Sequence, residues 1–228
     1  MKLSIQTNRP ENILGFCYLA FYQLFLPTVI ALVAEVLGYS LTLSELNIFY
    51  FVVNFVWVCA IFHRFLIASV QKAKENFGRC IQFAVLGLVI YFCAMYLVSM
   101  GIVLADPNFS NVNDDSIADL AQENTEMLFL CTVLLVPVVE EVIFRGLIFQ
   151  NLQRKSRLLA YGVSVVVFAL IHIVGYMGSA DWLTLGLCFV QYLPAGLALA
   201  WAYEKADTIV APILIHITIN LIGMTALR

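Results

Sequence analysis

The sequence predicts an all-α protein, a polytopic bundle of about seven transmembrane helices. Of the 228 residues, 62% are hydrophobic and only 12% are charged, and the mean hydropathy is +0.93. A soluble domain holds about half apolar and about a quarter charged residues, so one water-soluble core cannot bury this excess. The apolar residues also fall into runs of about 20, the length of helix that crosses the hydrocarbon of a bilayer.

The composition excludes several other classes of protein. A disordered chain needs low hydrophobicity and a high net charge, whereas the formal net charge here is −3. A membrane β-barrel alternates lipid-facing residues with polar ones, and no basic cluster with interleaved aromatic residues indicates nucleic-acid binding. We therefore predict one integral membrane domain over residues 1–228 that has the lipid bilayer as its surroundings.

Seven apolar segments are candidates for crossing the bilayer, each with boundaries uncertain by about two to four residues. The predicted spans are Ile13–Leu37, Leu46–Ala68, Ile81–Leu104, Met127–Ile148, Leu158–Tyr176, Leu183–Tyr203 and Ile209–Leu227. The stretch Arg64–Arg79 is amphipathic and basic, and it would supply an eighth helix lying in the membrane interface.

The connecting segments predict the orientation, because lysine and arginine stay on the cytoplasmic side of a membrane. Alternate connections are basic, and the ones between them contain no lysine or arginine. The basic residues of the predicted cytoplasmic side are Lys2, Arg9, Arg64, Lys72, Lys74, Arg79, Arg154, Lys155, Arg157 and Lys205. The N-terminus is therefore predicted to be cytoplasmic and the C-terminus external, with a bacterial plasma membrane favoured. The acidic segment Ala105–Glu126 then becomes a solvated outer loop, or a landing site for a basic ligand.

Ionisable residues inside predicted spans indicate a functional site, because placing them in the bilayer costs several kcal/mol. The fourth span holds Glu140, Glu141 and Arg145. Adjacent helical residues point about 100° apart, whereas residues at i and i+4 share a face. Glu141 is therefore expected to pair with Arg145, which leaves Glu140 to face a cavity. Pro137 removes a backbone hydrogen bond and is expected to open the helix just before the two glutamates.

Two later spans add imidazole and amide groups. His172 lies in the fifth span, and His216 and Asn220 share one face of the seventh. At about 1.5 Å per residue, Glu140 and the two histidines all reach the middle-to-inner half of the bilayer within the boundary error. A single histidine or asparagine often only joins helices, but the whole set would be a costly way to do so.

The predicted cluster suits hydrolysis of an amide bond. A carboxylate beside a neutral imidazole can take a proton from water, and an imidazole with an amide can stabilise a developing oxyanion. Alternatively, Glu140, His172 and His216 would hold a catalytic Zn²⁺ with water as its fourth ligand. The sequence contains neither the H-E-x-x-H motif of zincins nor the G-x-S-x-G motif of serine hydrolases. A proton-coupled transporter, which uses the same residue types, is a weaker alternative.

Three motifs on successive apolar segments resemble those of a known family. Glu140 to Arg145 fits Glu-Glu-x-x-x-Arg, Phe168 to His172 fits Phe-x-x-x-His, and His216 to Asn220 fits His-x-x-x-Asn. In this order they resemble the CPBP family, which comprises CAAX prenyl endopeptidases and bacterial bacteriocin-processing or immunity proteins, also called Abi proteins. The resemblance covers about residues 127–227, which would form the catalytic core.

This resemblance implies an intramembrane endopeptidase acting on a membrane-associated protein or peptide, with or without a lipid anchor. Glu140 with His172 would activate water, and His216 with Asn220 would stabilise the oxyanion. The residues that shape the site would be Glu141, Arg145 and Phe168.

The resemblance leaves two questions open. An asparagine stands in the last motif where a third strong ligand would be expected, which favours a metal-free glutamate mechanism over a zinc one. Some members of the family are thought to act as immunity or scaffold proteins, so a non-catalytic membrane protein is the alternative function.

Overall fold

The computed structural model describes residues 3–123 and 125–226, and all regular elements within them are helices. The first five are α1 (Arg9–Leu24), α2 (Leu26–Val36), α3 (Leu43–Ile61), α4 (His63–Glu75) and α5 (Phe77–Ala105). They are followed by α6 (Val112–Glu123), α7 (Thr125–Leu130), the π-helix η1 (Cys131–Leu135), α8 (Val136–Glu141), the π-helix η2 (Val142–Phe149) and α9 (Gln150–Gln153). The last are α10 (Arg157–Ile171), the short 3₁₀-helix η3 (Val174–Tyr176), α11 (Trp182–Ala206) and α12 (Val210–Ala226). Lys2, Leu227 and Arg228 lie outside the described residues.

The helices confirm a membrane-spanning all-α bundle, although not the number of seven spans. Four helices are long and apolar enough to cross a bilayer: Leu43–Ile61, Phe77–Ala105, Glu126–Gln153 and Trp182–Ala206. The pair α1 and α2 adds a fifth if it is counted as one bent span. The remaining two predicted spans correspond to the shorter apolar helices α10 and α12, of 15 and 17 residues.

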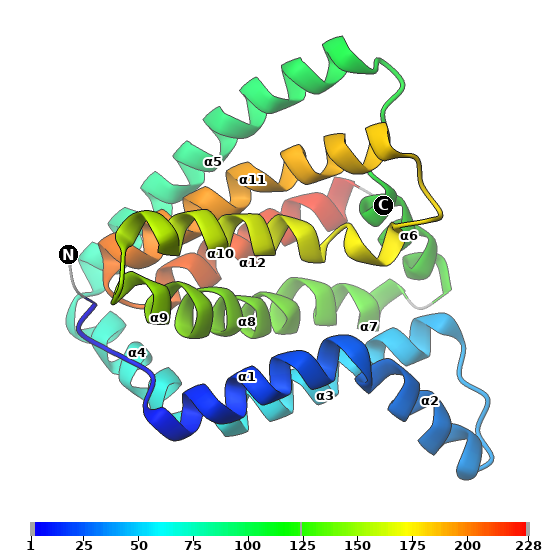
Figure 1. Cartoon of the computed structure of the whole chain (residues 1–228), viewed down its shortest axis with the longest axis horizontal. Helices are drawn as coiled ribbons and strands as arrows, with labels where there is room; N and C mark the ends of the chain where they lie inside the picture. Colours follow the sequence, from blue (N-terminus) through cyan, green and yellow to red (C-terminus); the bar gives the residue numbers. More distant parts are fainter. Residues whose placement is uncertain (1–2, 124, 227–228) are drawn as a thin grey trace.

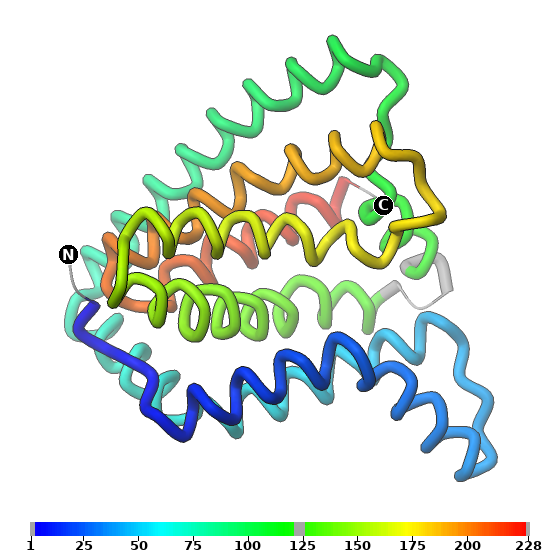
Figure 2. The backbone as a smooth tube through the Cα atoms, in the orientation of Figure 1, coloured from blue at the N-terminus to red at the C-terminus, as the bar shows by residue number. Residues whose placement is uncertain are grey.

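The first two predicted spans differ from the helices that form. The chain bends by 64° between α1 and α2, where Pro27 stands at the start of α2 and cannot donate a backbone hydrogen bond. Figure 2 shows α2 leaving the bundle at this bend. The second predicted span is shorter than expected, because α3 ends at Ile61 and a separate helix, α4, begins at His63. α4 lies within the stretch for which an interfacial helix was predicted, and it buries Phe65 and Ser69 on one face and carries basic residues.

The helix formed by residues 126–153 runs through the centre of the bundle. It lies between α1 and α3 on one side and α10, α11 and α12 on the other (Figure 1). In its most apolar stretch 56% of the residues are buried inside the protein, compared with 6% for α5. A helix enclosed by protein can carry polar groups that lipid would not tolerate, which explains why the ionisable motif stands on this span.

One end of the bundle is held together by polar contacts. The N-terminal segment before α1 crosses this end, where the Ser4 amide donates to Asp207 Oδ1 at 2.7 Å and the Thr7 amide to Gln150 Oε1 at 2.8 Å. The Arg79 guanidinium donates through Nε to the Lys205 carbonyl at 2.9 Å. The N-terminus, the start of α5 and the turn between α11 and α12 therefore lie together (Figure 1). We call this the basic end.

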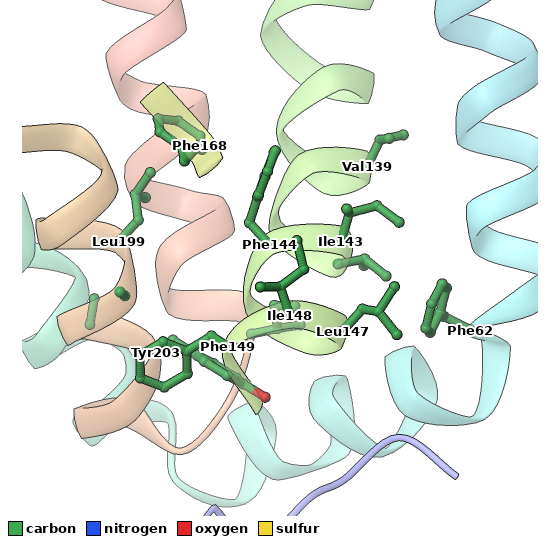
Figure 3. Packing of buried hydrophobic residues seen from close by; sticks show 14 of the residues in the cluster. Phe62, Val139, Ile143, Phe144, Leu147, Ile148, Phe149, Phe168, Leu199 and Tyr203 are labelled. Atoms are coloured by element: carbon green, nitrogen blue, oxygen red, sulfur yellow. The ribbon is translucent and has the colours of Figure 1, made fainter. Parts of the chain in front are cut away.

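A layer of large apolar side chains fills the bundle between the basic end and its middle. Figure 3 shows Phe149 and Tyr203 together at one side of the central helix, and Leu147 facing Phe62 at the other. Each of these four side chains is at most 2% exposed. The layer forms the main core of the protein and supports the polar residues above it.

Candidate active site

The central helix places its two adjacent glutamates in different surroundings. They end α8, a short α-helical stretch between the π-helices η1 and η2. π-turns inside α-helices are rare and occur frequently at functional sites. The side chain of Glu140 is 19% exposed, whereas that of Glu141 is completely buried. The predicted division between a cavity-facing and a core-facing carboxylate agrees with these positions.

The Glu141 carboxyl group accepts hydrogen bonds from two side chains. Arg145 Nη1 donates to Glu141 Oε1 at 2.9 Å, and His216 Nδ1 lies 2.8 Å from the same oxygen. Because Glu141 Oε1 accepts from Arg145, His216 Nδ1 is taken as the donor to this same oxygen. Arg145 Nη2 also donates to the Gly196 carbonyl at 3.1 Å. This buried network fixes the ring of His216, so that its Nε2 points away from Glu141.

Phe168 packs against the members of this network. Its ring centroid lies 4.6 Å from Arg145 Cζ, 4.8 Å from the ring of His172 and 5.9 Å from the ring of His216. An arginine over an aromatic face is stabilised by the cation–π attraction. Phe168 is 1% exposed, and it separates the two imidazoles and covers the guanidinium.

Glu140 faces both histidines without a direct hydrogen bond to either. Its Oε2 lies 3.9 Å from His172 Nε2 and 3.8 Å from His216 Nε2. This oxygen is buried and has no hydrogen-bond partner among the described residues. His172 Nδ1 lies 2.7 Å from the Phe168 carbonyl, which can only accept, so Nδ1 carries the hydrogen and leaves Nε2 as an acceptor in the neutral ring.

Asn220, the fourth predicted catalytic residue, contacts the backbone of the central helix instead of this cluster. Its Nδ2 donates to the Thr132 carbonyl at 2.9 Å, in η1, two turns before the glutamates. Within the described residues, its side chain has no hydrogen bond to Glu140 or to either histidine. In this arrangement the amide supports the π-turn of the central helix.

A cavity of about 650 Å³, including its open mouth, lies beside Glu140 and His172. One wall comes from the central helix and α10, through residues such as Val139, Phe144 and Ile171. The opposite wall comes from α1 and α3, and Asn113 of α6 completes the lining. The lining residues from α1 and α3 are Tyr22, Gln23, Tyr50, Phe51 and Asn54.

Sequence reasoning missed this second wall. The only signal was an asparagine within a predicted span, Asn54, which is 3% exposed and accepts from the Tyr18 hydroxyl at 2.7 Å. A tyrosine or phenylalanine in an apolar run looks the same whether it faces lipid or a pocket, so Tyr22 and Tyr50 carried no signal. Their place in the site depends on how α1 and α3 pack against α8.

The acidic segment after α5 is also different from the solvated loop that we expected. It forms α6, whose first residues contact Tyr192 of α11. The Tyr192 hydroxyl accepts from Asn113 Nδ2 at 3.0 Å and lies 3.3 Å from Asp114 Oδ1. Burial raises the pKa of Asp114 above its usual range, although the Tyr192 hydroxyl opposes this shift. The Tyr192 ring stacks on His172 with 4.2 Å between ring centroids, so α6 is connected to the site through one aromatic ring.

The zinc alternative requires three ligands to converge on one point. Two imidazoles with acceptor Nε2 atoms and a carboxylate have the chemistry that zinc prefers. However, their separations of 3.8 and 3.9 Å exceed the roughly 3.3 Å between ligand atoms of a tetrahedral zinc. In the part of the chain that the structure describes, no three His, Cys, Asp or Glu side chains are close enough to hold a metal ion. These positions do not fit zinc, and no step below is derived through a metal.

The fold and this cluster define a class of protein, a multi-pass helical membrane protein with one glutamate and two histidines around an internal pocket. A comparison with family models identifies the class further. Residues 122–222 match the model described as Type II CAAX prenyl endopeptidase Rce1-like. The matched range contains all three sequence motifs, so the predicted resemblance to the CAAX prenyl endopeptidase family is confirmed for this part of the chain.

Two curated bacterial proteins are similar to the chain. UPF0177 protein YxdF of Lactococcus lactis is 27% identical over 151 residues, which cover 64% of this chain and 77% of that protein. A Bacillus subtilis protein named "Putative membrane peptidase YdiL" is 28% identical over 154 residues, 64% of this chain. The match spans little more than half of that second protein, 56% of its length. No solved structure gives a significant match.

Proposed function

We propose that the protein is an intramembrane endopeptidase that hydrolyses a peptide bond of a membrane-associated protein or peptide. One observation carries the proposal: a buried, unpartnered carboxylate oxygen of Glu140 faces two imidazole nitrogens at the edge of an internal cavity. Buried polar atoms are normally hydrogen-bonded, so this group is available to an incoming molecule. The similarity to Type II CAAX prenyl endopeptidases supports the same activity at the level of the family.

Glu140 acts as the general base in this mechanism. A separation near 3.8 Å between two polar atoms leaves room for one water to bridge them. Such a water, held by Glu140 Oε2 and His172 Nε2, attacks the scissile carbonyl carbon as Glu140 takes its proton. When the carbon–nitrogen bond breaks, the protonated Glu140 gives that proton to the leaving amine.

His216 stabilises the negative charge that develops on the carbonyl oxygen. In this mechanism His216 carries a hydrogen on both ring nitrogens, and its Nδ1–H donates to Glu141 Oε1. The Nε2–H of that imidazolium then donates to the oxyanion. Asn220 joins this role only if its amide leaves the Thr132 carbonyl, so its direct contribution is proposed to be the smallest of the four.

The proposal is tested with protein reconstituted in nanodiscs and a library of peptides from a membrane proteome. Cleavage is read by mass spectrometry as new peptide N-termini. The wild-type chain is expected to produce a set of cleavages that the Glu140→Gln and His172→Ala variants lack. Metal content of the same samples distinguishes the two mechanisms, since the glutamate mechanism predicts full activity in a preparation without stoichiometric zinc. A wild-type chain that produces no cleavage beyond that seen with Glu140→Gln would instead support the non-catalytic immunity or scaffold function.

A further inference from the structure

The cavity beside Glu140 is closed toward the basic end of the bundle. Phe144 forms its floor, and Leu147, Phe149 and Tyr203 lie beneath in the apolar layer of Figure 3. Each of these four side chains is at most 2% exposed. The N-terminal segment then crosses the outside of this layer through the Thr7 contact with Gln150. A polar substrate approaching from the basic end would have to pass this apolar layer.

The opposite end supplies the rim of the cavity. Asn113 comes from α6, and Gln23 comes from the last turn of α1. His172 follows α10, whose 15 residues begin at Arg157 near the basic end and rise by roughly 22 Å. The cavity is therefore in the half of the bundle away from the basic end, not in the middle-to-inner half that the sequence predicted, and its mouth is next to α6.

The basic residues show which end faces the cytoplasm. In residues 3–123 and 125–226, no lysine or arginine lies at the end that carries α6. Arg145 is buried in the site, and the other described basic residues are at the basic end: Arg9, Arg64, Lys72, Lys74, Arg79, Arg154, Lys155, Arg157 and Lys205. Positive residues in short connections are retained in the cytoplasm. The closed end of the cavity is thus the cytoplasmic one.

We infer that the cavity is entered from the non-cytoplasmic side, and that its substrate is an unwound peptide segment presented on that side of the membrane. The inference rests on the proposed peptidase function and adds the side of entry and the class of substrate. A polypeptide segment held on the cytoplasmic face would have no path to Glu140.

The lining combines apolar side chains with phenol and amide groups, and the polar groups favour a peptide backbone over a lipid chain. The rim and wall present phenol and amide groups of Tyr22, Gln23, Tyr50, Asn54 and Asn113. Phenols and amides hydrogen-bond to the carbonyl and N–H groups of an extended peptide, whereas an isoprenoid chain offers them no partner.

Cysteine accessibility tests the side of entry. The six native cysteines are replaced by alanine or serine, and Val136→Cys is placed in the cavity wall with Ile171→Cys as a second pocket position. Val89→Cys is the control on the lipid-facing side of α5, where Val89 is 52% exposed. Asp119→Cys and Lys74→Cys mark the two ends. A membrane-impermeant maleimide is applied to bacterial spheroplasts and to inverted vesicles.

The pocket cysteines are expected to react at least about tenfold faster in spheroplasts than in inverted vesicles, because maleimide needs a water-exposed thiolate. Asp119→Cys should behave in the same way and Lys74→Cys in the opposite way, while Val89→Cys should stay unreactive. Faster labelling of both pocket positions in inverted vesicles overturns the inference, and so does labelling no faster than that of Val89→Cys. If Glu140→Gln still abolishes peptide cleavage in either case, the side of entry is wrong but the proposed function stands. Cleavage that survives Glu140→Gln rejects the function itself.

Discussion

Two carboxylate clusters, around Glu204 and around Glu140, differ in how completely their hydrogen bonds are made. Glu204, near the basic end, is 2% exposed and accepts from Gln153, Arg157 and Tyr161 at 2.7 to 3.1 Å. Glu140, in the middle of the bundle, has a buried oxygen with no partner among the described residues. A satisfied buried carboxylate holds helices together, whereas an unsatisfied oxygen costs stability. Glu141 Oε2 also lacks a partner among the described residues, but Glu140 lines the cavity and Glu141 does not, so the position of Glu140 indicates a functional role. The comparison therefore separates residues that build the bundle from residues that act in it.

The largest expected effect is on catalysis at Glu140. Glu140→Gln should lower kcat for peptide cleavage by roughly 10³-fold or more, because the amide cannot take a proton from water. It should leave the denaturation midpoint in detergent unchanged or slightly raised, since a charged group is removed from a buried position.

Glu204→Gln is the matched control for this effect. It replaces the same side chain in the other cluster, and it should lower the midpoint while kcat stays within about threefold of wild type. A loss of cleavage in Glu204→Gln that equals the loss in Glu140→Gln would break the comparison.

The next effect concerns the buried pair of Glu141 and Arg145, whose side chains are both 0% exposed. Arg145→Met should destabilise the protein by about 3–5 kcal/mol, because it leaves the Glu141 carboxylate buried without its cation. The double variant with Glu141→Gln should recover part of this loss, since no uncompensated charge remains. Chemical denaturation of the wild type, both single variants and the double variant measures the coupling, and strictly additive losses would contradict the pairing.

The sequence predicted the membrane bundle and the residue types of the site better than it predicted their surroundings. The i, i+4 spacing of Glu141 and Arg145 predicted their contact, because the geometry of a helix determines which of its residues lie side by side. The contacts between site residues on different helices depend on how those helices pack together. The amide of Asn220 contacts the Thr132 carbonyl, since the π-turn of η1 presents that carbonyl to α12. Spacing along one helix contains no information about a backbone group exposed on another.

The predicted number of seven spans is not confirmed, for a related physical reason. Helices enclosed by protein do not need the full 20 residues, and α10 is 15 residues long. A bend such as the one after α1 also depends on how the neighbouring helices pack around it. The acidic segment was expected in solvent because six of its residues are acidic, yet Asn113 and Asp114 contact Tyr192. Composition predicts where a segment is exposed on average and does not predict which side chain turns inward.

The loss of His172 should have an intermediate effect on catalysis. His172→Ala should lower kcat by about 10²-fold, because Glu140 keeps its proton-accepting role but the water loses one of its two supports. The stacked Tyr192 ring loses its partner as well, so stability is measured in parallel. His63→Ala provides the matched control, since His63 is an exposed histidine at the start of α4. Full activity of His172→Ala would remove this imidazole from the mechanism.

The smallest effect is expected at Tyr192, a positioning residue that acts through His172. Tyr192→Phe keeps the stacked ring and removes the hydroxyl that contacts Asn113 and Asp114. One neutral hydrogen bond contributes about 0.5–1.5 kcal/mol, so kcat should fall about three- to tenfold while KM changes little. Asp114→Asn should be better tolerated than Asp114→Ala, because burial already disfavours the charged form of Asp114 and the amide oxygen can still accept from Tyr192. Asp119→Asn, on the exposed face of α6, controls for loss of charge. If Tyr192→Phe alters KM alone, α6 contributes to substrate binding and does not position His172.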